Sequence, residues 1–345
     1  MKKRIIVKIG TNTLTKNNSI DVAFISDIAL QISELRKTNY DIIIVTSGAI
    51  GLGSAELGLQ KSREVKIKQA TAAIGQNILM EKYSAAFKKH NIKVAQLLLS
   101  YEDFSDRKRY LNLRNCIETL LKLGVVPIIN ENDPISVDEI GATFGDNDKL
   151  SALVASKINA GLLIILSDID GLYDKNPKTN KDAKLIKKVT EITKEIEKAA
   201  GKSGSDFAIG GMLTKIKAAK IAMESGCNMV ICNGKKKGVL SKVISSKEGT
   251  IFLAKERLSN RERWIKFSKA KGKIIVDEGA ANALKNDKSL LSVGIRAVEG
   301  DFDKGDIVEI NNFAKGISDY SSSELRKIKG KKGKVVVKSE NVVLV

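Results

Sequence analysis

The five residues from Phe144 to Asp148, FGDND, place two carboxylates and an amide side by side just before the apolar run LSALVAS. Between Asn130 and Asp148 the chain carries six carboxylates and no lysine or arginine. Crowded like charges disfavour ionisation unless a cation neutralises them. The countercharge must therefore come from elsewhere in the fold or from a ligand, such as an ammonium group, a metal ion or distant lysines. The alternative is an acidic loop exposed to solvent.

Two lysines lie next to turns of small residues that are suited to phosphate. Lys8 lies in the strand-like run RIIVKIG, and small residues follow it from Gly10 onwards. Gly210 and Gly211 precede a helical stretch that reaches Lys215 after about one turn, so backbone N–H groups and an ammonium group would face the same polyphosphate. The spacing is not that of a P-loop, and a glycine pair alone is weak support. For Lys8, the alternative is a lysine at an ordinary strand end.

Two further strand ends carry polar groups suited to ligands. Ser47 and Gly48, in TSGAIGLG, lie where a helix should begin, so the hydroxyl and N–H groups would hold a carboxylate or a phosphate. The alternative is a serine that only caps the helix. In LSDIDGLYDKNP, a buried strand ends in Ser167 and Asp168, and the Gly, Asn and Pro of the following loop suit a nucleotide's base and ribose. Neither stretch is a dinucleotide fingerprint, which needs GxGxxG followed by an acidic residue.

Taken together, these groups predict phosphoryl transfer. Lys8 and Lys215 come from opposite ends of the first 255 residues, and Asp146 and Asp148 come from the middle. In phosphoryl transfer a protein mainly positions the reactants and stabilises charge, while Mg²⁺ bridges phosphate oxygens. We expect the carboxylates to hold the lysines in place and to help organise the metal ion. No residue is assigned as a direct metal ligand.

Strands and helices that alternate along the chain must position these groups. Apolar runs predict strands at residues 4–10, 41–48, 93–99, 124–130, 162–168 and 228–232. Helical spacing of apolar residues predicts helices at 22–37, 64–89, 107–123, 149–159 and 212–225. Continuous apolar strands alternating with helices indicate an α/β fold, a layered and mainly parallel sheet flanked by helices. In such sheets ligands bind beyond the carboxyl ends of the strands, where the polar groups lie.

The character of the chain changes near residue 254. Residues 1–255 are predicted to form the catalytic domain, and residues 256–271, which hold the only tryptophan, a basic linker. Residues 272–345 are predicted to form a small, mostly β domain. That prediction depends on the short runs KIIVDEG, DIVEI, GKVVVK and NVVLV and on one helical piece near residues 280–285.

Composition excludes several classes of function. Three cysteines without a CxxC pair and a single histidine, His90, argue against a disulfide framework and exclude a multi-histidine metal site. The net charge is +19, but the excess is spread out, and residues 271–345 carry 14 basic and 11 acidic side chains. This favours a lysine-rich surface over a nucleic-acid site. No apolar run approaches the roughly 18 residues of a membrane span, and MKKRIIVKIG indicates a first strand, not a signal peptide. We expect a cytoplasmic protein without a membrane partner.

Six motifs in order, VKIGTNTL, TSGAIGLG, INENDP, FGDNDKLSALVA, LSDIDGLYD and GGMLTKIKAA, resemble the amino acid kinase family. They are most similar to the family members that phosphorylate L-glutamate. The C-terminal stretch that begins IIVDEGAANALK resembles a PUA domain, which bacterial members of that group often carry. The resemblance covers nearly the whole chain. It implies ATP-dependent phosphorylation of the side-chain carboxylate of L-glutamate to L-glutamyl 5-phosphate, the first step of proline biosynthesis, with Mg²⁺.

The resemblance also implies which residues carry out the reaction. Lys8 and Lys215 would stabilise the transferring phosphoryl group. Asp146 would orient these two lysines, and Asp148 would lie beside it in the catalytic centre. No covalent intermediate is needed, because the substrate carboxylate is itself the nucleophile.

The same resemblance assigns the two substrates. L-Glutamate would bind to Ser47, Asp133 and Asn147, with Asp133 contacting its α-ammonium group. ATP would be held by the residues that match the family's nucleotide site: Lys8, Ser167, Asp168, Gly210, Gly211, Met212, Leu213, Thr214 and Lys215. Ser167 stands where the family often has threonine, a change that keeps the hydroxyl.

Partners follow from the resemblance as well. Proline is expected as a feedback inhibitor at or near the glutamate site, and dimers or tetramers as the assembly. Because an acyl phosphate is unstable, functional coupling to a glutamyl phosphate reductase is expected. Two alternatives stay open. One is a relative that acts on N-acetylglutamate or aspartate, although the PUA-like tail and FGDND count against it. The other is an RNA-binding protein, supported by the basic linker and the run RKIKGKKGK.

Overall fold

The structure is a computed structural model of the chain. It describes residues 3–16, 19–60, 62, 64–135, 147–177, 179–202 and 211–345. The chain divides into two compact units. The first consists of Met1–Ser100 and Asn112–Arg257, and the second of Tyr101–Leu111 and Leu258–Val345.

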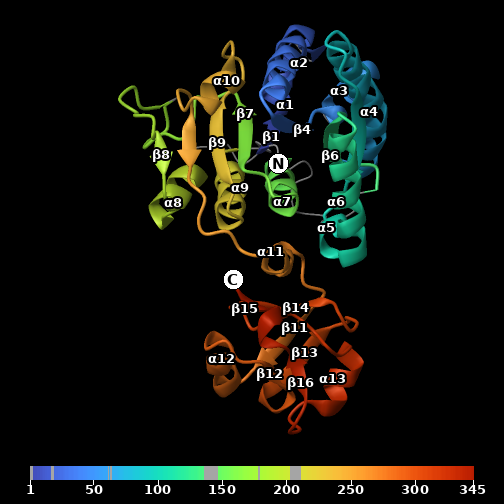
Figure 1. Cartoon of the computed structure of the whole chain (residues 1–345), viewed down its shortest axis with the longest axis vertical. Coiled ribbons are helices and arrows are strands. Elements are labelled where there is room, and N and C mark those ends of the chain that lie inside the picture. Colours follow the sequence, from blue (N-terminus) through green and yellow to red (C-terminus); the bar gives the residue numbers. More distant parts are fainter. Residues whose placement is uncertain are drawn as a thin grey trace. The chain divides into compact units, whose positions relative to one another are not determined.

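An eight-stranded sheet lies at the centre of the first unit (Figure 1), in the order β5-β6-β4-β1-β7-β9-β10-β8. From β5 to β9 in this order all neighbours are parallel, and β10 is antiparallel to β9. A separate hairpin joins β2 to β3. The bounds are β1 (Lys3–Ile9), β2 (Thr15–Lys16), β3 (Ser19–Ile20), β4 (Tyr40–Val45), β5 (Val94–Leu99), β6 (Val126–Glu131), β7 (Leu162–Ser167), β8 (Lys188–Val189), β9 (Asn228–Asn233) and β10 (Thr250–Phe252).

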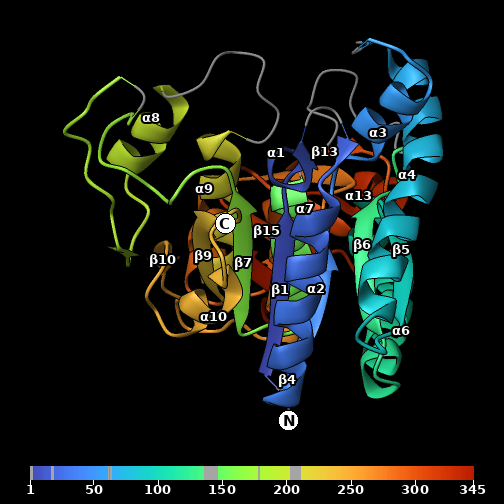
Figure 2. The same cartoon turned by 90° about the horizontal axis from the view of Figure 1, so that it is seen from above.

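Helices cover both faces of this sheet. Figures 1 and 2 show α2 on one face and α7 on the other. One core cluster lies on the first face, where apolar side chains of β1, β4, β6 and β7 pack against α2, α4 and α10. The bounds are α1 (Thr11–Leu14), α2 (Val22–Lys37), α3 (Ala49–Glu56), α4 (Val65–Lys88), α6 (Arg107–Lys122), α7 (Asn147–Lys157), α8 (Lys194–Lys202), α9 (Met212–Glu224) and α10 (Val239–Ile244).

The predicted α/β fold with a mainly parallel sheet is confirmed. Five consecutive residues of β1, Ile5 to Ile9, are buried, so both faces of the strand are covered, as in parallel sheets. All six predicted strands and all five predicted helices of this unit are present, with ends shifted by at most a few residues. The short helices α8 and α10 were not predicted, because six to nine residues give too few turns for a clear helical period.

Two glycines bring α3 and α4 into backbone contact. A Cβ atom on Gly53 would lie 1.8 Å from the carbonyl oxygen of Thr71, and one on Gly75 would lie 1.9 Å from that of Ala49. Only a residue without a side chain allows this approach. The contact fixes the turn that leads from β4 into α3, where Ser47 and Gly48 lie, against the middle of α4.

The second unit has its own sheet, in the order β13-β11-β14-β15-β17, and a small pair, β12 with β16. A core of apolar side chains from these strands and from α12 and α13 lies inside it. This agrees with the predicted small, mostly β domain. The bounds are α5 (Glu102–Ser105), α11 (Asn260–Phe267), β11 (Gly272–Val276), α12 (Glu278–Lys285), β12 (Leu290–Leu291), β13 (Ile295–Gly300), β14 (Ile307–Ile310), β15 (Ala314–Ile317), α13 (Ser322–Ile328), β16 (Val335–Val337) and β17 (Val342–Leu344).

The stretch that we predicted as a basic linker contains the helix α11. Ser259 caps it, accepting a hydrogen bond from the N–H of Glu262, whose side chain accepts one from the N–H of Ser259. Trp264, on this helix, is buried against Tyr110 and Ile317 of the same unit. The many charges of this stretch led us to predict a linker, although it contains a short helix with one buried side. The predicted boundaries, with the catalytic domain at 1–255, the linker at 256–271 and the small domain at 272–345, stay a proposal.

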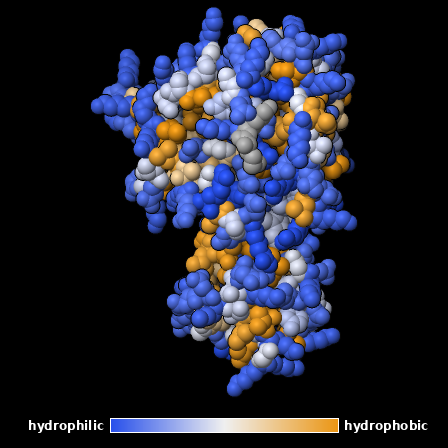
Figure 3. All heavy atoms as spheres, viewed as in Figure 1, coloured by the Kyte–Doolittle hydropathy of each residue, from blue (hydrophilic) through white to orange (hydrophobic). Residues whose placement is uncertain are grey.

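Hydrophilic side chains cover most of the face that Figure 3 shows, interrupted by smaller apolar patches. Within the described ranges, no helix combines the length and apolarity that a membrane span requires.

Candidate active site

A buried ion-pair centre lies where β1, α7 and α9 meet. Asp148, in the first turn of α7, is 1% exposed. Its Oδ1 lies 2.6 Å from Nζ of Lys8, at the end of β1, and its Oδ2 lies 3.2 Å from Nζ of Lys215, on α9. The hydroxyl of Thr214 donates a hydrogen bond to the same Oδ2 at 2.8 Å. One carboxylate therefore holds two ammonium groups that are 207 positions apart in the sequence.

The charge of this carboxylate follows from its neighbours. Burial on its own would raise the pKa of Asp148, but Lys8 and Lys215, with hydrogen bonds from Lys8 and Thr214, outweigh burial and lower the pKa to about 2. The group is therefore ionised at neutral pH. Lys8, Lys215 and Asp148 together carry a net charge of +1, which suits an incoming polyphosphate.

The end of β4 forms the next wall of the site. The hydroxyl of Ser47 donates to the carbonyl oxygen of Ile9 at 3.0 Å and accepts from the hydroxyl of Thr11 at 3.1 Å. Gly48 has φ = +100° and directly precedes α3, so a residue with a side chain would be strained there. Ser47 thus joins the ends of β1 and β4, although it does not cap α3 with its side chain.

Three amide side chains form a hydrogen-bonded chain beside Ser47, which we call the amide chain: Asn147, Asn130 and Gln76. Nδ2 of Asn147 donates to the carbonyl oxygen of Thr46 at 2.7 Å and to Oδ1 of Asn130 at 3.0 Å. Nδ2 of Asn130 donates to Oε1 of Gln76 at 2.8 Å. All three side chains are buried.

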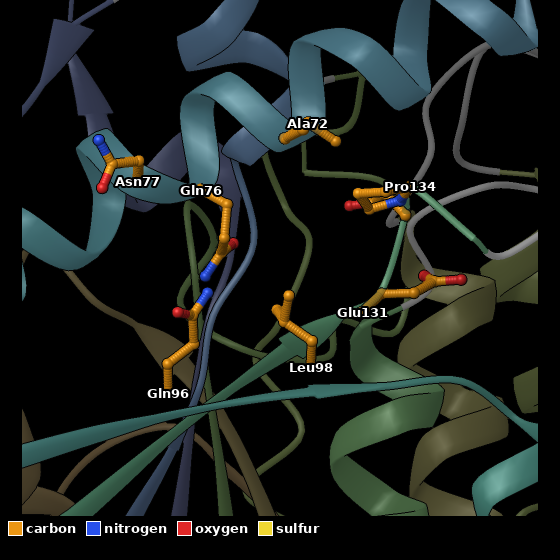
Figure 4. Close-up of a pocket in the computed structure, with 9 residues that line it drawn as sticks. Ala72, Gln76, Asn77, Gln96, Leu98, Glu131 and Pro134 are labelled. Carbon is orange, nitrogen blue, oxygen red and sulfur yellow. The ribbon is translucent and has the colours of Figure 1, made fainter.

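A cavity of about 310 Å³ lies at the far end of the amide chain. Figure 4 shows Gln76 pointing from α4 into it, with Gln96 and Leu98 of β5 opposite and Glu131 and Pro134 at the side. Its volume is at the lower end of the range for small-molecule sites, which is roughly 300–1,000 Å³. A small polar metabolite fits a space of this size.

Asp133 also lines this cavity and has an unusual protonation equilibrium. Burial, and then the nearby carboxylate of Glu131, raise the pKa of Asp133 to about 7. Its Oδ1 is buried and has no hydrogen-bond partner among the described residues. A buried carboxylate without a partner is costly, so the side chain is suited to a cationic group of a ligand.

The predicted nucleotide residues lie at the ends of β7 and α9. The hydroxyl of Ser167 donates to Oδ1 of Asp168 at 3.1 Å, and Nδ2 of Asn12 donates to Oδ2 at 3.4 Å. Burial opposes ionisation of Asp168, but hydrogen bonds, including its own N–H, lower its pKa. Gly211 precedes α9 without a side-chain cap, so the first N–H groups of that helix are available to an anion.

The family models match both parts of the chain. The amino acid kinase family matches residues 3–233, and the PUA domain matches residues 272–341. The chain belongs to the amino acid kinase family. Within it, a glutamate 5-kinase of Methanosarcina barkeri is 58% identical over 342 residues, which cover 95% of this chain and 89% of that protein. Glutamate 5-kinases of Thermoanaerobacter sp. (strain X514) and Pelobacter propionicus are 47% and 43% identical, and cover 95% and 99% of this chain and 90% and 97% of their own length.

At this identity and coverage the chain is a member of the glutamate 5-kinase group, as the motifs predicted. Solved structures of the amino acid kinase fold are more distant. The UMP kinase of Ureaplasma parvum has a TM-score of 0.50 at 21% identity and covers 73% of this chain and 99% of its own. An isopentenyl phosphate kinase has a TM-score of 0.52 at 20% identity, with 72% and 99% covered. These two likenesses support the fold alone.

The structure brings most predicted site residues together in two groups. Lys8, Asp148, Thr214 and Lys215 form the ion-pair centre, while Asn147 and Asp133 lie at the amide chain and the cavity. Met212 and Leu213 begin α9 next to Gly211, with Leu213 39% exposed. Asp146 and Gly210 lie outside the described residues. The role that the resemblance gives to Asp146, orienting the two lysines, therefore stays a prediction. Asp148 itself contacts both lysines.

The sequence motifs predict no role for Asn130 and Gln76. Asn130 is in the motif INENDP, so its place at a strand end was a usable signal. Gln76 lies in the middle of a long helix, where a polar residue on a partly apolar helix gives no signal of a site.

Proposed function

We propose that the chain transfers the γ-phosphoryl group of ATP to the side-chain carboxylate of L-glutamate, giving L-glutamyl 5-phosphate and ADP in the first step of proline biosynthesis. The observation that carries the chemistry is the convergence of Lys8 and Lys215 on the buried carboxylate of Asp148. The substrate follows from the membership in the glutamate 5-kinase group.

In this reaction an oxygen of the substrate carboxylate attacks the γ-phosphorus, and the bond from that phosphorus to the β,γ-bridging oxygen breaks. The electron pair of that bond leaves with ADP, and no proton needs to be transferred. Negative charge on the transferring oxygens meets Lys8 and Lys215, which Asp148 holds in place before the substrates arrive. Preorganised cations of this kind each contribute about 3 kcal/mol to lowering a barrier, a factor of a few hundred in rate.

L-Glutamate would bind between the ion-pair centre and the cavity. Ser47 and Asn147 would hold it near the transferring phosphoryl group, and Asp133 would accept a hydrogen bond from its α-ammonium group. The unpaired Oδ1 of Asp133 supports this assignment. A bound ammonium group would also favour the ionised form of Asp133, against the effect of burial.

ATP would bind across the ends of β7 and α9. Lys8, Ser167, Asp168 and the segment from Gly210 to Lys215 would hold it, with the N–H groups at the start of α9 facing the phosphates. Among the described residues, no group of three or more His, Cys, Asp or Glu side chains is placed to hold a metal ion. Mg²⁺ commonly keeps several waters and binds through substrate phosphates, so the residues fit a Mg²⁺ that ATP carries. When bound, it neutralises phosphate charge.

The test is a hydroxylamine assay, in which acyl phosphates are trapped as hydroxamates. Purified protein is incubated with ATP, Mg²⁺ and L-glutamate, N-acetylglutamate or aspartate in parallel. We expect hydroxamate with L-glutamate alone. The Lys215→Ala variant should lose the signal, while Lys217→Ala, an exposed lysine two positions further on the same helix, should keep it.

Product from N-acetylglutamate or aspartate would keep the kinase chemistry and overturn the substrate. No product from any acceptor would overturn the proposed activity and favour the RNA-binding alternative, which a salt-dependent binding assay with RNA would then examine.

The proposed activity also suggests an inhibitor, a partner enzyme, an assembly and a location in the cell, all of which stay proposals. Proline would act as a feedback inhibitor at or near the glutamate site, and a glutamyl phosphate reductase would consume the unstable product. Dimers or tetramers would be the assembly, and the cytoplasm the location. RNA binding by the PUA domain is not expected. That domain has a net charge of only +3 over residues 271–345.

A further inference from the structure

The orientation of each group in the amide chain is fixed by the backbone. The carbonyl oxygen of Thr46 can only accept, so Asn147 must turn Nδ2 towards it. The N–H of Glu131 can only donate, at 2.9 Å, so Asn130 must turn Oδ1 towards it. Nδ2 of Asn130 therefore donates to Gln76, which must accept through its Oε1. As a result, the Nε2 donor of Gln76 is the group left over at the cavity end.

This donor has no hydrogen-bond partner in the part of the chain that the structure describes. Nε2 of Gln76 is buried and makes no hydrogen bond with any residue that the structure describes, and the side chain is only 7% exposed. Figure 4 shows the amide group directed into the cavity, towards Gln96. An unsatisfied buried donor is unfavourable, so its place at a cavity indicates a ligand that accepts.

We propose that Gln76 is a substrate-binding residue whose Nε2 donates a hydrogen bond to the α-carboxylate of the amino-acid substrate. This inference rests on the proposed function and deepens it. The cavity then offers two complementary groups, a donor from Gln76 for the α-carboxylate and an acceptor from Asp133 for the α-ammonium group. Gln76 thereby determines specificity against a ligand that lacks the α-carboxylate, while Asp133 does so against one that lacks the α-ammonium group.

The experiment measures ligand affinity of the full chain by calorimetry in the absence of ATP. L-Glutamate is compared with 4-aminobutanoate, which lacks the α-carboxylate, and with glutarate, which lacks the ammonium group. The variants are Gln76→Leu, which removes both amide functions, and Gln76→Glu, which keeps an oxygen for Asn130 but removes the donor. Gln31→Leu is the control, because Gln31 is an equally buried glutamine on α2 whose partners are Asp27 and Leu240.

We expect both Gln76 variants to weaken L-glutamate and glutarate by about 10- to 150-fold, the range for a hydrogen bond to a charged group. The neutral variant, Gln76→Leu, should leave 4-aminobutanoate unchanged. Asp133→Asn should do the reverse, weakening 4-aminobutanoate but not glutarate. Gln31→Leu should change none of the affinities.

Equal weakening of all three ligands in the Gln76 variants would mean that Gln76 only supports the fold of the site, and would overturn the proposal. Unchanged affinity of Gln76→Glu for L-glutamate would also overturn the proposal, and this result can be obtained even if an analogue binds too weakly to measure. The failure of the proposed function is a separate result, because it would appear in the wild-type chain as a missing hydroxamate.

Discussion

The ion-pair centre and the cavity lie within one site but differ in how their polar groups are satisfied. At the ion-pair centre both oxygens of Asp148 contact ammonium groups, and its pKa is lowered to about 2. At the cavity, Oδ1 of Asp133 and Nε2 of Gln76 have no hydrogen-bond partner among the described residues, and the pKa of Asp133 is raised to about 7. The ionised form of Asp148 is therefore stabilised by its neighbours, whereas the ionised form of Asp133 is destabilised by burial and by Glu131.

This difference corresponds to two kinds of task. The cations that stabilise a transferring phosphoryl group must be in position before the reaction, so the protein supplies their counterion itself. The groups that recognise an amino acid must be free until it arrives, so they stay unpaired at a cost in stability. Substitutions at the two regions are therefore expected to have opposite effects on stability.

The largest effect is expected at the ion-pair centre. In Asp148→Asn, Lys8 and Lys215 would lose their counterion and remain buried beside each other. Breaking a buried ion pair costs about 3–5 kcal/mol, and we expect the free energy of unfolding in urea to fall by this order. Turnover in the hydroxamate assay should fall by about a hundredfold or more, because the two cations are no longer held in place.

The control for this prediction is Asp301→Asn, which removes an ion pair with Arg326 whose aspartate side chain is 91% exposed. Exposed pairs contribute about 0–1 kcal/mol, so little change is expected. Because the folded-state pKa of Asp148 is lowered, its contribution is complete above pH 3.8 and is lost as the pH falls towards 2. Wild-type stability in Asp148→Asn at pH 7 would contradict the importance of the ion-pair centre.

The opposite sign is expected at the cavity. The pKa of Asp133 is raised from 3.8 to about 7, so its protonated form favours the folded state, and that contribution is lost as the pH rises through 7. Asp133→Asn cannot ionise, and at pH 8 we expect it to be more stable than the wild type, on the order of 1–4 kcal/mol. Thermal unfolding at pH 8 and pH 5 measures this, and the gain should shrink at the lower pH.

The same variant should bind L-glutamate more weakly, because its α-ammonium group would lose the carboxylate. If Asp133→Asn were less stable than the wild type at pH 8 and bound L-glutamate equally well, the proposed difference between the ion-pair centre and the cavity would be wrong.

A smaller effect is expected where α3 and α4 support both regions. In Gly75→Ala the new methyl group would meet the carbonyl oxygen of Ala49, and the helices would have to separate. Overpacking of this kind typically costs about 1–3 kcal/mol, measurable by urea unfolding. Gly51→Ala on α3 is the matched control, because nothing lies within 4 Å of a Cβ atom there. Equal stability of the two variants would show that the close approach does not constrain the site.

Much of this arrangement could be predicted from the sequence. The strands with continuous apolar runs and the polar residues at their ends predicted Lys8 and Ser47 at one edge of the sheet, because parallel strands end on the same side. The crowded carboxylates pointed to Asp148, and the family resemblance pointed to Asp133. The glycine pair before α9 located Lys215. These signals are local, so a single stretch of sequence carries each of them.

The remaining features depend on contacts between distant residues. Nothing local distinguishes Gln76 from other polar residues on α4, and its donor is left over only because two backbone groups fix the amide chain. The opposite shifts in pKa of Asp133 and Asp148 likewise come from neighbours in space. Charge dominated our interpretation of residues 256–271 and concealed α11, whose buried Trp264 lies in one cluster with Tyr110, which precedes it by 154 positions.

The smallest effect, and the one that separates the two carboxylates most directly, is on pH dependence. If ionised Asp133 accepts from the α-ammonium group, KM for L-glutamate should rise by a few fold between pH 7.5 and pH 6.5, because an increasing share of Asp133 is protonated below its pKa of about 7. Turnover at saturating L-glutamate should stay nearly constant, since Asp148, with its pKa lowered to about 2, remains ionised over the whole range. In Asp133→Asn the rise in KM should disappear. A rise that persists in this variant would assign the titration to a different group and leave the cavity without its pH-sensitive carboxylate.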